Sequence, residues 1–303
     1  MIEGTRRRGW RRSLRRRVFY PFEALAARSA FAVFRALGVE AASNLGGRIA
    51  RLAGPRLAPS RQAARNLRRA FPDKSDAEID RIVRDMWDNL GRVIGEYPHT
   101  RDIDAYGDGR IEVIGAENID ELRDDGRPGL FFTAHFGNWE ITPPIITQRG
   151  LPITIVYRAA NNPAVDEVVR KARDCEGVEQ VPKGPVGARR AIELLGNGGH
   201  LGLLVDQKMN DGIPIPFFGR DAMTAPALAQ LALRYHCPVV PVRSERTRGT
   251  RFRVTFFPPL EAVDTGDRDA DMAAFMTRVN AMIEGWVRER PEQWFWLHRR
   301  WED

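Results

Sequence analysis

The spacing of hydrophobic residues divides the chain into a helical first part and a mixed second part. Between residues 40 and 97 apolar side chains recur with the period of an amphipathic helix. Ser75 and Glu78 have the spacing of a capping box, so one of these helices is predicted to begin directly after Ser75. From about residue 110 onward, short β-rich runs alternate with helical runs.

The apolar runs of the second part predict strands that are buried on both faces. The runs that are mostly apolar and rich in β-branched or aromatic residues are 129–134, 152–157, 200–205, 238–243 and 252–257. Helix candidates lie at 138–148, 163–174, 186–196, 224–235 and 269–289. Alternation of apolar strands with helices predicts an α/β fold, in which helices flank a mostly parallel central sheet.

Positive charge is concentrated at the amino end. The chain of 303 residues has a net charge of +7, and residues 1–17, with eight arginines and one glutamate, account for all of it. Such an arm can bind nucleic acid or the anionic surface of a membrane. The rest of the chain has no basic surplus and no aromatic RNA-binding segment, so nucleic-acid binding is the remote alternative and is not expected.

The segment after the arm favours the membrane surface. Its apolar residues fall on one side of a helix, with Arg28 and Arg35 roughly opposite: Phe19, Phe22, Ala26, Val33 and Leu37. Its uncharged stretches are too short for a spanning helix or a signal peptide. We therefore expect residues 1–39 to anchor the chain on an anionic membrane without crossing it, although an ordinary packed helix has the same pattern.

Residues 40–303 are predicted to form the main domain, with a helical lead-in at 40–109 and an α/β core at 110–303.

Cys175 and Cys237 are isolated in the sequence, and the five histidines have no ligand-like spacing. Glycine-rich phosphate-binding motifs are absent from the sequence. We therefore expect no metal and no cofactor.

One histidine stands where an α/β sheet usually carries its chemistry. His135 directly follows the predicted strand 129–134, and functional residues of open α/β sheets collect beyond the carboxyl ends of strands. Glu140 comes five positions later, and Gly137 and Asn138 between them supply a turn and a helix N-cap. This spacing suits a carboxylate that orients a general-base histidine; a histidine merely hydrogen-bonded at a strand end is the structural alternative.

Two further strand ends carry polar candidates. Arg158 follows the strand 152–157, and it would share a sheet edge with His135 if the strands are parallel. An arginine there suits an oxyanion or phosphate contact, or else a structural ion pair. Asp206 ends the strand 200–205 and could orient either Arg158 or His135.

Six blocks of the sequence occur in the order of one enzyme family. They are ARNLRRAFPDKS (64–75), HFGNWE (135–140), VYRAANNP (156–163), GHLGLLVDQ (199–207), IPFFGRDAMTAPALAQLA (215–232) and WFWLHRR (294–300). Together they resemble the late (secondary) lipid A acyltransferases of the lauroyl- and myristoyltransferase type, within the lysophospholipid acyltransferase superfamily. The F-P-E-G-like block of glycerol-3-phosphate acyltransferases is absent, and Pro143 and Pro144 depart from a regular helix after Glu140.

The resemblance implies a glycerolphosphate-acyltransferase-like fold and an activity. The enzyme would transfer a fatty acyl chain from acyl carrier protein to a hydroxyl of a lipid A precursor, during lipopolysaccharide biosynthesis at the cytoplasmic face of the bacterial inner membrane. His135 would be the general base and Glu140 its partner. An acyl thioester is already activated, so no serine or cysteine nucleophile is required. Acylation of another glycolipid from acyl-CoA, such as a phosphatidylinositol mannoside, is the alternative.

The same resemblance supplies the remaining binding candidates. They are Arg158, Asp206, Gln207, Phe218, Gly219 and Thr224. Phe218, Gly219 and Thr224 would line the acyl or acceptor channel, or else form a glycine turn and a helix cap. The carboxyl-terminal residues 294–301 combine tryptophan with arginine, which fits either a lipid headgroup site or a packing cluster.

Overall fold

The computed structural model describes residues 19–302, so the predicted arm at 1–17 lies outside the described residues. The first part is helical, as its pattern predicts: α2 (Tyr20–Leu37), α3 (Val39–Ala53), η2 (Gly54–Arg56), α4 (Pro59–Ala70), α5 (Asp76–Glu96) and η3 (Tyr97–Asp102). The capping box is confirmed, because the Ser75 amide donates to the Glu78 carboxylate at 2.9 Å. Helices α3 and α5 approach so closely that a Cβ atom on Gly46 would lie 2.2 Å from the Gly91 carbonyl oxygen.

The second part forms a seven-stranded sheet in the order β1-β9-β8-β2-β5-β3-β4. Its strands are β1 (Ile111–Ile114), β2 (Gly129–Thr133), β3 (Ile153–Tyr157), β4 (Val178–Pro182), β5 (His200–Leu204), β8 (Val239–Arg248) and β9 (Arg251–Phe256). Every neighbouring pair is parallel except β8 and β9, which confirms a mostly parallel central sheet. The short strands β1 and β4, whose polar residues interrupt the apolar runs, were not predicted.

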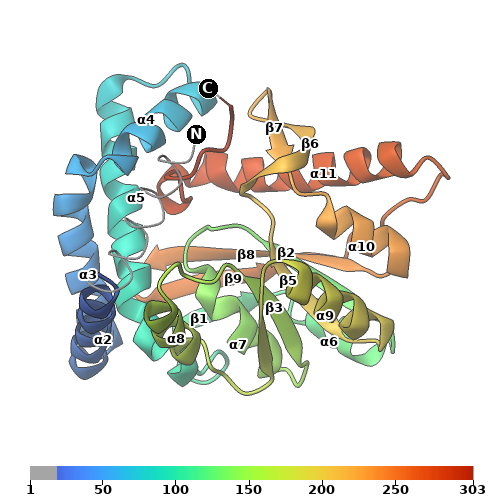
Figure 1. Ribbon diagram of the computed structural model, residues 1–303, viewed down its shortest axis with the longest axis horizontal. Helices are drawn as coiled ribbons and strands as arrows, with labels where there is room; N and C mark the ends of the chain where they lie inside the picture. The colour runs from blue at the N-terminus through green and yellow to red at the C-terminus, as the bar shows by residue number, and fades with distance from the viewer. Residues whose placement is uncertain (1–18, 303) are drawn as a thin grey trace, which may run out of the picture.

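Helices cover both faces of the sheet (Figure 1). Their bounds are α6 (Glu117–Asp124), η4 (Trp139–Ile141), α7 (Thr142–Thr147), α8 (Pro163–Ala172), α9 (Pro185–Gly196), α10 (Ala227–Tyr235), α11 (Arg268–Glu289) and η5 (Pro291–Gln293). Helices α6 and α7 share one hydrophobic core with the sheet, and α10 and α11 share the other. A separate antiparallel hairpin, β6 (Lys208–Phe217) and β7 (Arg220–Thr224), packs against α11.

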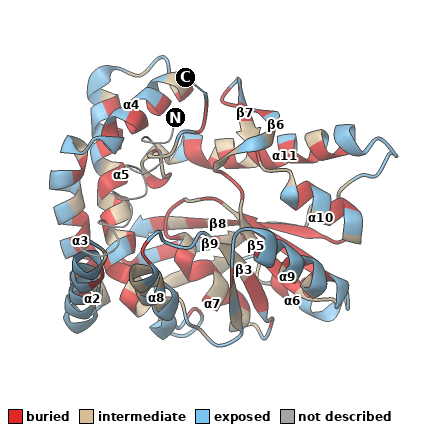
Figure 2. Ribbon diagram, viewed as in Figure 1, coloured by how far each residue is buried: buried red, intermediate tan, exposed pale blue. Residues whose placement is uncertain are grey.

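Much of α2 and α3 is exposed to solvent (Figure 2), and the exposed residues of both helices include large apolar ones. On α2, Ala24 and Phe34 are buried, whereas the opposite side leaves Phe22 69% and Leu25 62% exposed. The exposed apolar residues of the two helices and of residue 19 are Phe19, Phe22, Leu25, Val33, Leu37, Leu45, Ile49 and Leu52. We call this set the apolar face. Among residues 19–302, no helix combines the length and apolar content needed to cross a bilayer.

Candidate active site

His135 and Asp206 form the central contact of the site. The ring Nδ1 of His135 lies 2.8 Å from Oδ1 of Asp206, and the backbone amide of His135 donates to Oδ2 at 2.9 Å. The indole Nε1–H of Trp294 donates to the same Oδ2 at 2.8 Å. A carboxylate that accepts from Nδ1–H leaves the lone pair of Nε2 free to accept a proton.

The pairing of β2 with β5 brings the two residues together. The strands run parallel and in register, with Thr133 beside Leu204, so His135 and Asp206 leave the sheet at the same edge. The backbone amide of Val205 donates to the carbonyl of Thr133 at 3.2 Å, which fixes the chain directly before Asp206. Of the two partners that the sequence allowed for Asp206, the structure selects His135.

The turn after His135 is built from the residues that the sequence indicated. Gly137 has φ of +60°, and a Cβ atom there would lie 1.9 Å from the carbonyl oxygen of Ser244, so only glycine fits. The side chain of Asn138 accepts from the amide of Glu140 at 3.1 Å and thereby caps η4. The backbone amide of Phe295 also donates to the His135 carbonyl at 3.0 Å.

A buried ion pair supports this turn from behind. Glu96 at the end of α5 accepts from both terminal nitrogens of Arg246 on β8, and it also accepts from the Asn138 side chain at 2.8 Å. Asn89 links the same arginine to the carbonyl of Gly137 at 2.9 Å. Because Glu96 and Arg246 are less than a tenth exposed, each charge depends on the other for its stability.

Glu140 does not contact His135, which corrects the predicted pairing. Its carboxylate instead accepts from Arg173 at 2.6 Å through both Nε and Nη2, and from the side chains of Tyr97 and Trp139. The predicted pairing fails because the η4 turn directs Glu140 toward Arg173, the residue after α8, whereas Asp206, which follows β5, already supplies a carboxylate to His135 Nδ1. Burial alone would raise the pKa of Glu140, but Arg173 and the other donors bring it below its ordinary value, so Glu140 is ionised.

Asp206 is also ionised despite complete burial. Burial raises its pKa, but the charge of His135 and the hydrogen bonds from this histidine outweigh burial, so the pKa lies well below the ordinary range. Gln207 lies on the other side of the ring, with its side-chain nitrogen 3.5 Å from His135 Nε2. The side chain of His135 is 17% exposed, so an incoming molecule can reach the ring.

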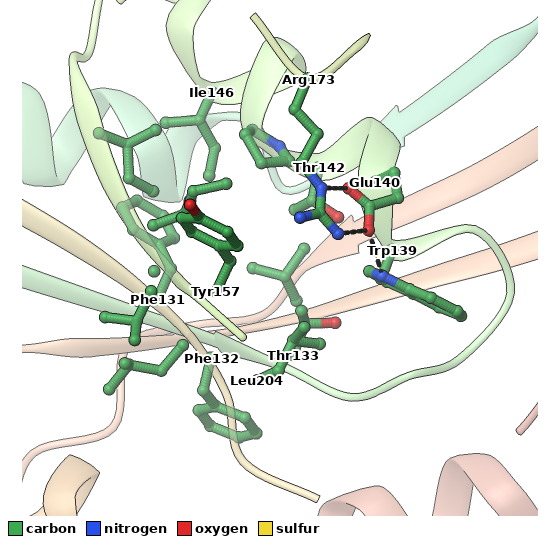
Figure 3. A pocket seen from close by; sticks show the side chains of 17 residues that line it. Phe131, Phe132, Thr133, Trp139, Glu140, Thr142, Ile146, Tyr157, Arg173 and Leu204 are labelled. Carbon is green, nitrogen blue, oxygen red and sulfur yellow. Dashed lines mark hydrogen bonds and ion pairs between the residues drawn. The ribbon is translucent and has the colours of Figure 1, made fainter. Parts of the chain in front are cut away.

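An apolar pocket with a cavity volume of about 60 Å³ lies beside Trp139 (Figure 3). It lies between α7 and the sheet face formed by β2, β5 and β3. Its apolar lining includes Phe131, Ile146, Ile153, Ile155, Leu204 and Val242. Trp139 lines the pocket, and its ring meets the His135 ring edge-on at a centroid distance of 5.0 Å. Trp139 therefore links His135 to this apolar pocket, whose lining does not include the histidine itself.

Polar groups gather at the end of the pocket that adjoins Trp139. The hydroxyls of Thr133 and Thr142 are buried there without a hydrogen-bond partner among the described residues. Arg173 also lines the pocket and lies over the rings of Tyr97 and Tyr157, at 5.3 and 5.9 Å. Figure 3 shows its guanidinium between Glu140 and Tyr157. The pocket thus has a polar end near Trp139 and an apolar remainder.

Arg158 lies at the predicted edge of the sheet. It follows β3, which is parallel to β5, so it leaves the sheet on the same side as His135 and Asp206. Its side chain is exposed and makes no hydrogen bond or ion pair with residues 19–302. The structural ion pair that the sequence allowed is therefore not formed within the described part of the chain.

The residues that were predicted to line the channel lie in the hairpin of β6 and β7. Phe218 is buried against the rings of Phe71, Trp296 and Trp301. Thr224 is fully buried, and its hydroxyl accepts from Arg300 at 2.9 Å. Phe218 and Gly219 form the hairpin turn, both with positive φ. This packing within the protein corrects the prediction that Phe218 and Thr224 line a channel. Thr224 also does not cap α10, because that helix begins only at Ala227.

The tryptophan-rich carboxyl end is a packing cluster. Trp294, Trp296 and Arg300 are fully buried, and Arg300 lies over the ring of Phe217 at 5.0 Å. Burial lowers the pKa of Arg300 to about 10. His298 stands edge-on to Trp294 at 4.9 Å, and both of its ring nitrogens are buried without a hydrogen bond of good geometry to residues 19–302.

Several residues that hold the site have little sequence signal. Glu96 and Asn89 lie on the inward side of α5, where the other buried residues are apolar or glycine. Their polar character at these positions was the one indication of a structural role in the sequence. Arg173 follows α8 among other charged residues, so nothing in the local pattern separates it from a solvated arginine. Among residues 19–302 there is no group of three or more His, Cys, Asp or Glu side chains that could hold a metal ion.

The buried state of His298 predicts a pH dependence of stability. Burial lowers its pKa to about 4, whereas an unfolded histidine has a pKa of about 6.5. Between these values the unfolded chain binds a proton that the folded chain does not, so the free energy of unfolding falls as the pH falls, by up to about 3 kcal/mol. In His298→Gln this loss should be absent. Urea unfolding at pH 7 and pH 4.5 measures it, and parallel losses in both proteins would refute the explanation.

Comparison with known proteins finds relatives of one family. A family profile described as bacterial lipid A biosynthesis acyltransferase matches residues 16–303. The lipid A biosynthesis myristoyltransferase of Escherichia coli K12 is 25% identical over 261 residues, which cover 82% of this chain and 77% of that protein. The lauroyltransferase of the same organism is 27% identical over 246 residues, covering 78% and 76%.

Among solved structures, the 1-acyl-sn-glycerophosphate acyltransferase of Thermotoga maritima aligns with 80% of this chain and 96% of its own, at 14% identity and a TM-score of 0.35. The family match spans nearly the whole chain, including the block that holds His135 and the block that holds Asp206. The chain belongs to the bacterial lipid A biosynthesis acyltransferase family, and it is an acyltransferase.

Proposed function

We propose that this enzyme transfers a fatty acyl chain from an acyl carrier protein thioester to a hydroxyl of a lipid A precursor. The observation that carries the proposal is a histidine whose Nδ1 is engaged by Asp206, whose Nε2 faces the Gln207 side chain at 3.5 Å, and whose ring contacts Trp139 at the wall of an apolar pocket. The names of the relatives supply the acceptor class. The acyl carrier protein is the donor that the resemblance of the sequence blocks implies.

The reaction needs one base and one group that stabilises negative charge. Nε2 of His135 takes the proton from the acceptor hydroxyl as its oxygen attacks the thioester carbonyl carbon. Asp206 stabilises the imidazolium that forms. When the tetrahedral intermediate collapses, the C–S bond breaks, the ester remains on the acceptor, and His135 returns the proton to the departing thiolate.

Glu140 acts in this proposal through Arg173. By holding both Nε and Nη2, Glu140 orients the guanidinium beside the polar end of the pocket. A cation and the unpaired hydroxyls of Thr133 and Thr142 are groups that stabilise a thioester carbonyl as its charge grows. Arg158, exposed at the same edge, is a candidate contact for a phosphate of the acceptor, and Gln207 for its hydroxyl region.

The pocket suits the acyl chain of the donor. Apolar side chains line the part away from His135, and burial of each methylene group there stabilises binding by about 0.8 kcal/mol. The polar end next to Trp139, whose ring contacts that of His135, fits the thioester, so the two ends of the pocket match the two ends of an acyl thioester. The same pocket would hold an acyl chain delivered by CoA, so the lining alone does not identify the carrier.

The apolar face suits the membrane on which both lipids reside. Its members on α2 follow helical spacing, and its members on α3, Leu45, Ile49 and Leu52, extend it beyond the predicted anchor. An amphipathic helix with this pattern lies in the interface with its apolar side among the acyl chains. We place the enzyme on the cytoplasmic face of the bacterial inner membrane as a peripheral or monotopic protein.

Activity assays test the proposed reaction directly. Purified enzyme with acyl carrier protein thioester and a lipid A precursor should yield a product heavier by one acyl group in mass spectra. His135→Ala should lower the rate by about 10²- to 10⁴-fold with an unchanged melting curve. Acylation of phosphatidylinositol mannoside from acyl-CoA, with none of the lipid A precursor, would replace the proposal by its alternative, and an active His135→Ala would remove the mechanism.

Vesicle sedimentation tests the membrane placement. Changing Phe22, Leu25 and Val33 together to serine removes apolar area from the exposed side of α2 and leaves its buried residues in place. This variant should stay in the supernatant with vesicles that contain anionic lipid, whereas wild-type protein should pellet. The control is Val186→Ser, which changes an equally exposed residue, 70% accessible, on α9. Equal pelleting of all three proteins would exclude an interfacial role for α2.

A further inference from the structure

Trp294, near the carboxyl end of the chain, donates a hydrogen bond into the centre of the site. Its indole Nε1 lies 2.8 Å from Oδ2 of Asp206, which also accepts from the backbone amide of His135 at 2.9 Å. The other oxygen, Oδ1, lies 2.8 Å from Nδ1 of His135. The indole thus contacts the carboxylate that orients the histidine, and it is not part of the pocket lining.

Backbone pairing and burial fix the position of this indole. Residues 293–295 lie antiparallel to residues 135–137 and form a β-bridge with them. Two backbone hydrogen bonds, 2.9 and 3.0 Å long, join the two segments on either side of the bridge. The Trp294 ring is fully buried, and the rings of Trp296 and Phe217 pack against it at centroid distances of 4.6 and 5.6 Å. The indole N–H therefore keeps one direction, toward the carboxylate.

The indole reduces the negative charge that His135 experiences. A nearby carboxylate favours the protonated form of an imidazole, and a further donor to the carboxylate offsets part of its charge. Asp206 is only 1% exposed, so bulk water does not replace a donor that is lost. Without the indole N–H, more of the carboxylate charge would act on the ring of His135 and hold its proton more firmly.

We infer that Trp294 is a positioning residue for acyl transfer: its indole N–H fixes the Asp206 carboxylate and offsets part of its charge, so that His135 loses its proton and acts as a base at a lower pH. The inference deepens the proposed function and rests on it, because it takes His135 as the base. It gives the tryptophan a part in the reaction that reaches beyond packing at the carboxyl end of the chain.

The pH dependence of transfer reports on this effect because the other charged groups around the pair keep their charge between about pH 5 and pH 8. The charged or titratable side chains on the elements that pack against the pair are His298, Arg300, Glu140, Arg173, Glu96 and Arg246. Burial lowers the pKa of His298 to about 4 and that of Arg300 to about 10, so His298 is neutral and Arg300 is charged throughout this range. The other four form the two buried ion pairs.

Transfer rates measured against pH test the inference. In wild-type enzyme, kcat/KM with the acyl carrier protein thioester should fall toward low pH as the base is protonated. In Trp294→Phe the pH of the half-maximal rate should rise by about 0.5 to 1 unit, because charge that the N–H offset then acts on the imidazolium. Replacing Trp294 by benzothienylalanine keeps the fused rings and exchanges only the N–H for sulfur. It should give the same rise even if Trp294→Phe does not fold.

Trp301→Phe is the matched control. This indole is also buried, but it donates to a neutral group, the carbonyl of Phe217, at 3.2 Å. Its loss weakens packing at the carboxyl end and leaves the donors to Asp206 in place, so the pH of the half-maximal rate should equal that of wild type.

Two results would overturn the inference and leave the proposed function intact. One is a half-maximal pH that is unchanged or lowered in both Trp294 variants, and the other is an equal rise in Trp301→Phe. If wild-type enzyme showed no transfer, or transfer that does not fall toward low pH, the proposed general-base reaction would be wrong, and this inference with it.

Discussion

The hydrogen bond between His135 Nδ1 and Asp206 is the interaction on which the site depends. It forms because β2 and β5 are parallel neighbours in register, so that residues distant in sequence leave the sheet at one edge. Asp206 remains ionised at full burial because the imidazole, the His135 amide and the Trp294 indole all approach its two oxygens. Removing any one donor leaves a buried charge less well compensated, which couples the histidine to the tryptophan-rich carboxyl end.

Two buried ion pairs stabilise different parts of the site. Glu96 with Arg246 holds the turn that follows His135, and Glu140 with Arg173 holds the polar end of the pocket. The first pair joins α5 to β8, and the second joins η4 to the residue after α8. The helical lead-in is therefore part of the active-site scaffold and not an appendage of the α/β core.

Much of this arrangement was predictable from sequence because it depends on local pattern. The apolar strands, the Ser75 capping box and the turn at Gly137 each follow from neighbouring residues. The partner of Glu140 was mispredicted because Arg173 approaches from an element far along the chain, and spacing carries no information on that contact. Thr224 was misplaced for a similar reason, since Arg300 reaches it from the carboxyl end.

The tautomer of His135 tests the central claim most directly. Nitrogen-15 NMR of labelled protein, with His135 assigned by substitution, reports which ring nitrogen carries the proton in the neutral form. If Asp206 is the partner, wild type and Glu140→Gln should both show the Nδ1–H form with a strongly hydrogen-bonded proton, and Asp206→Asn should lose that signal. Loss of the signal in Glu140→Gln together with its retention in Asp206→Asn would contradict the account.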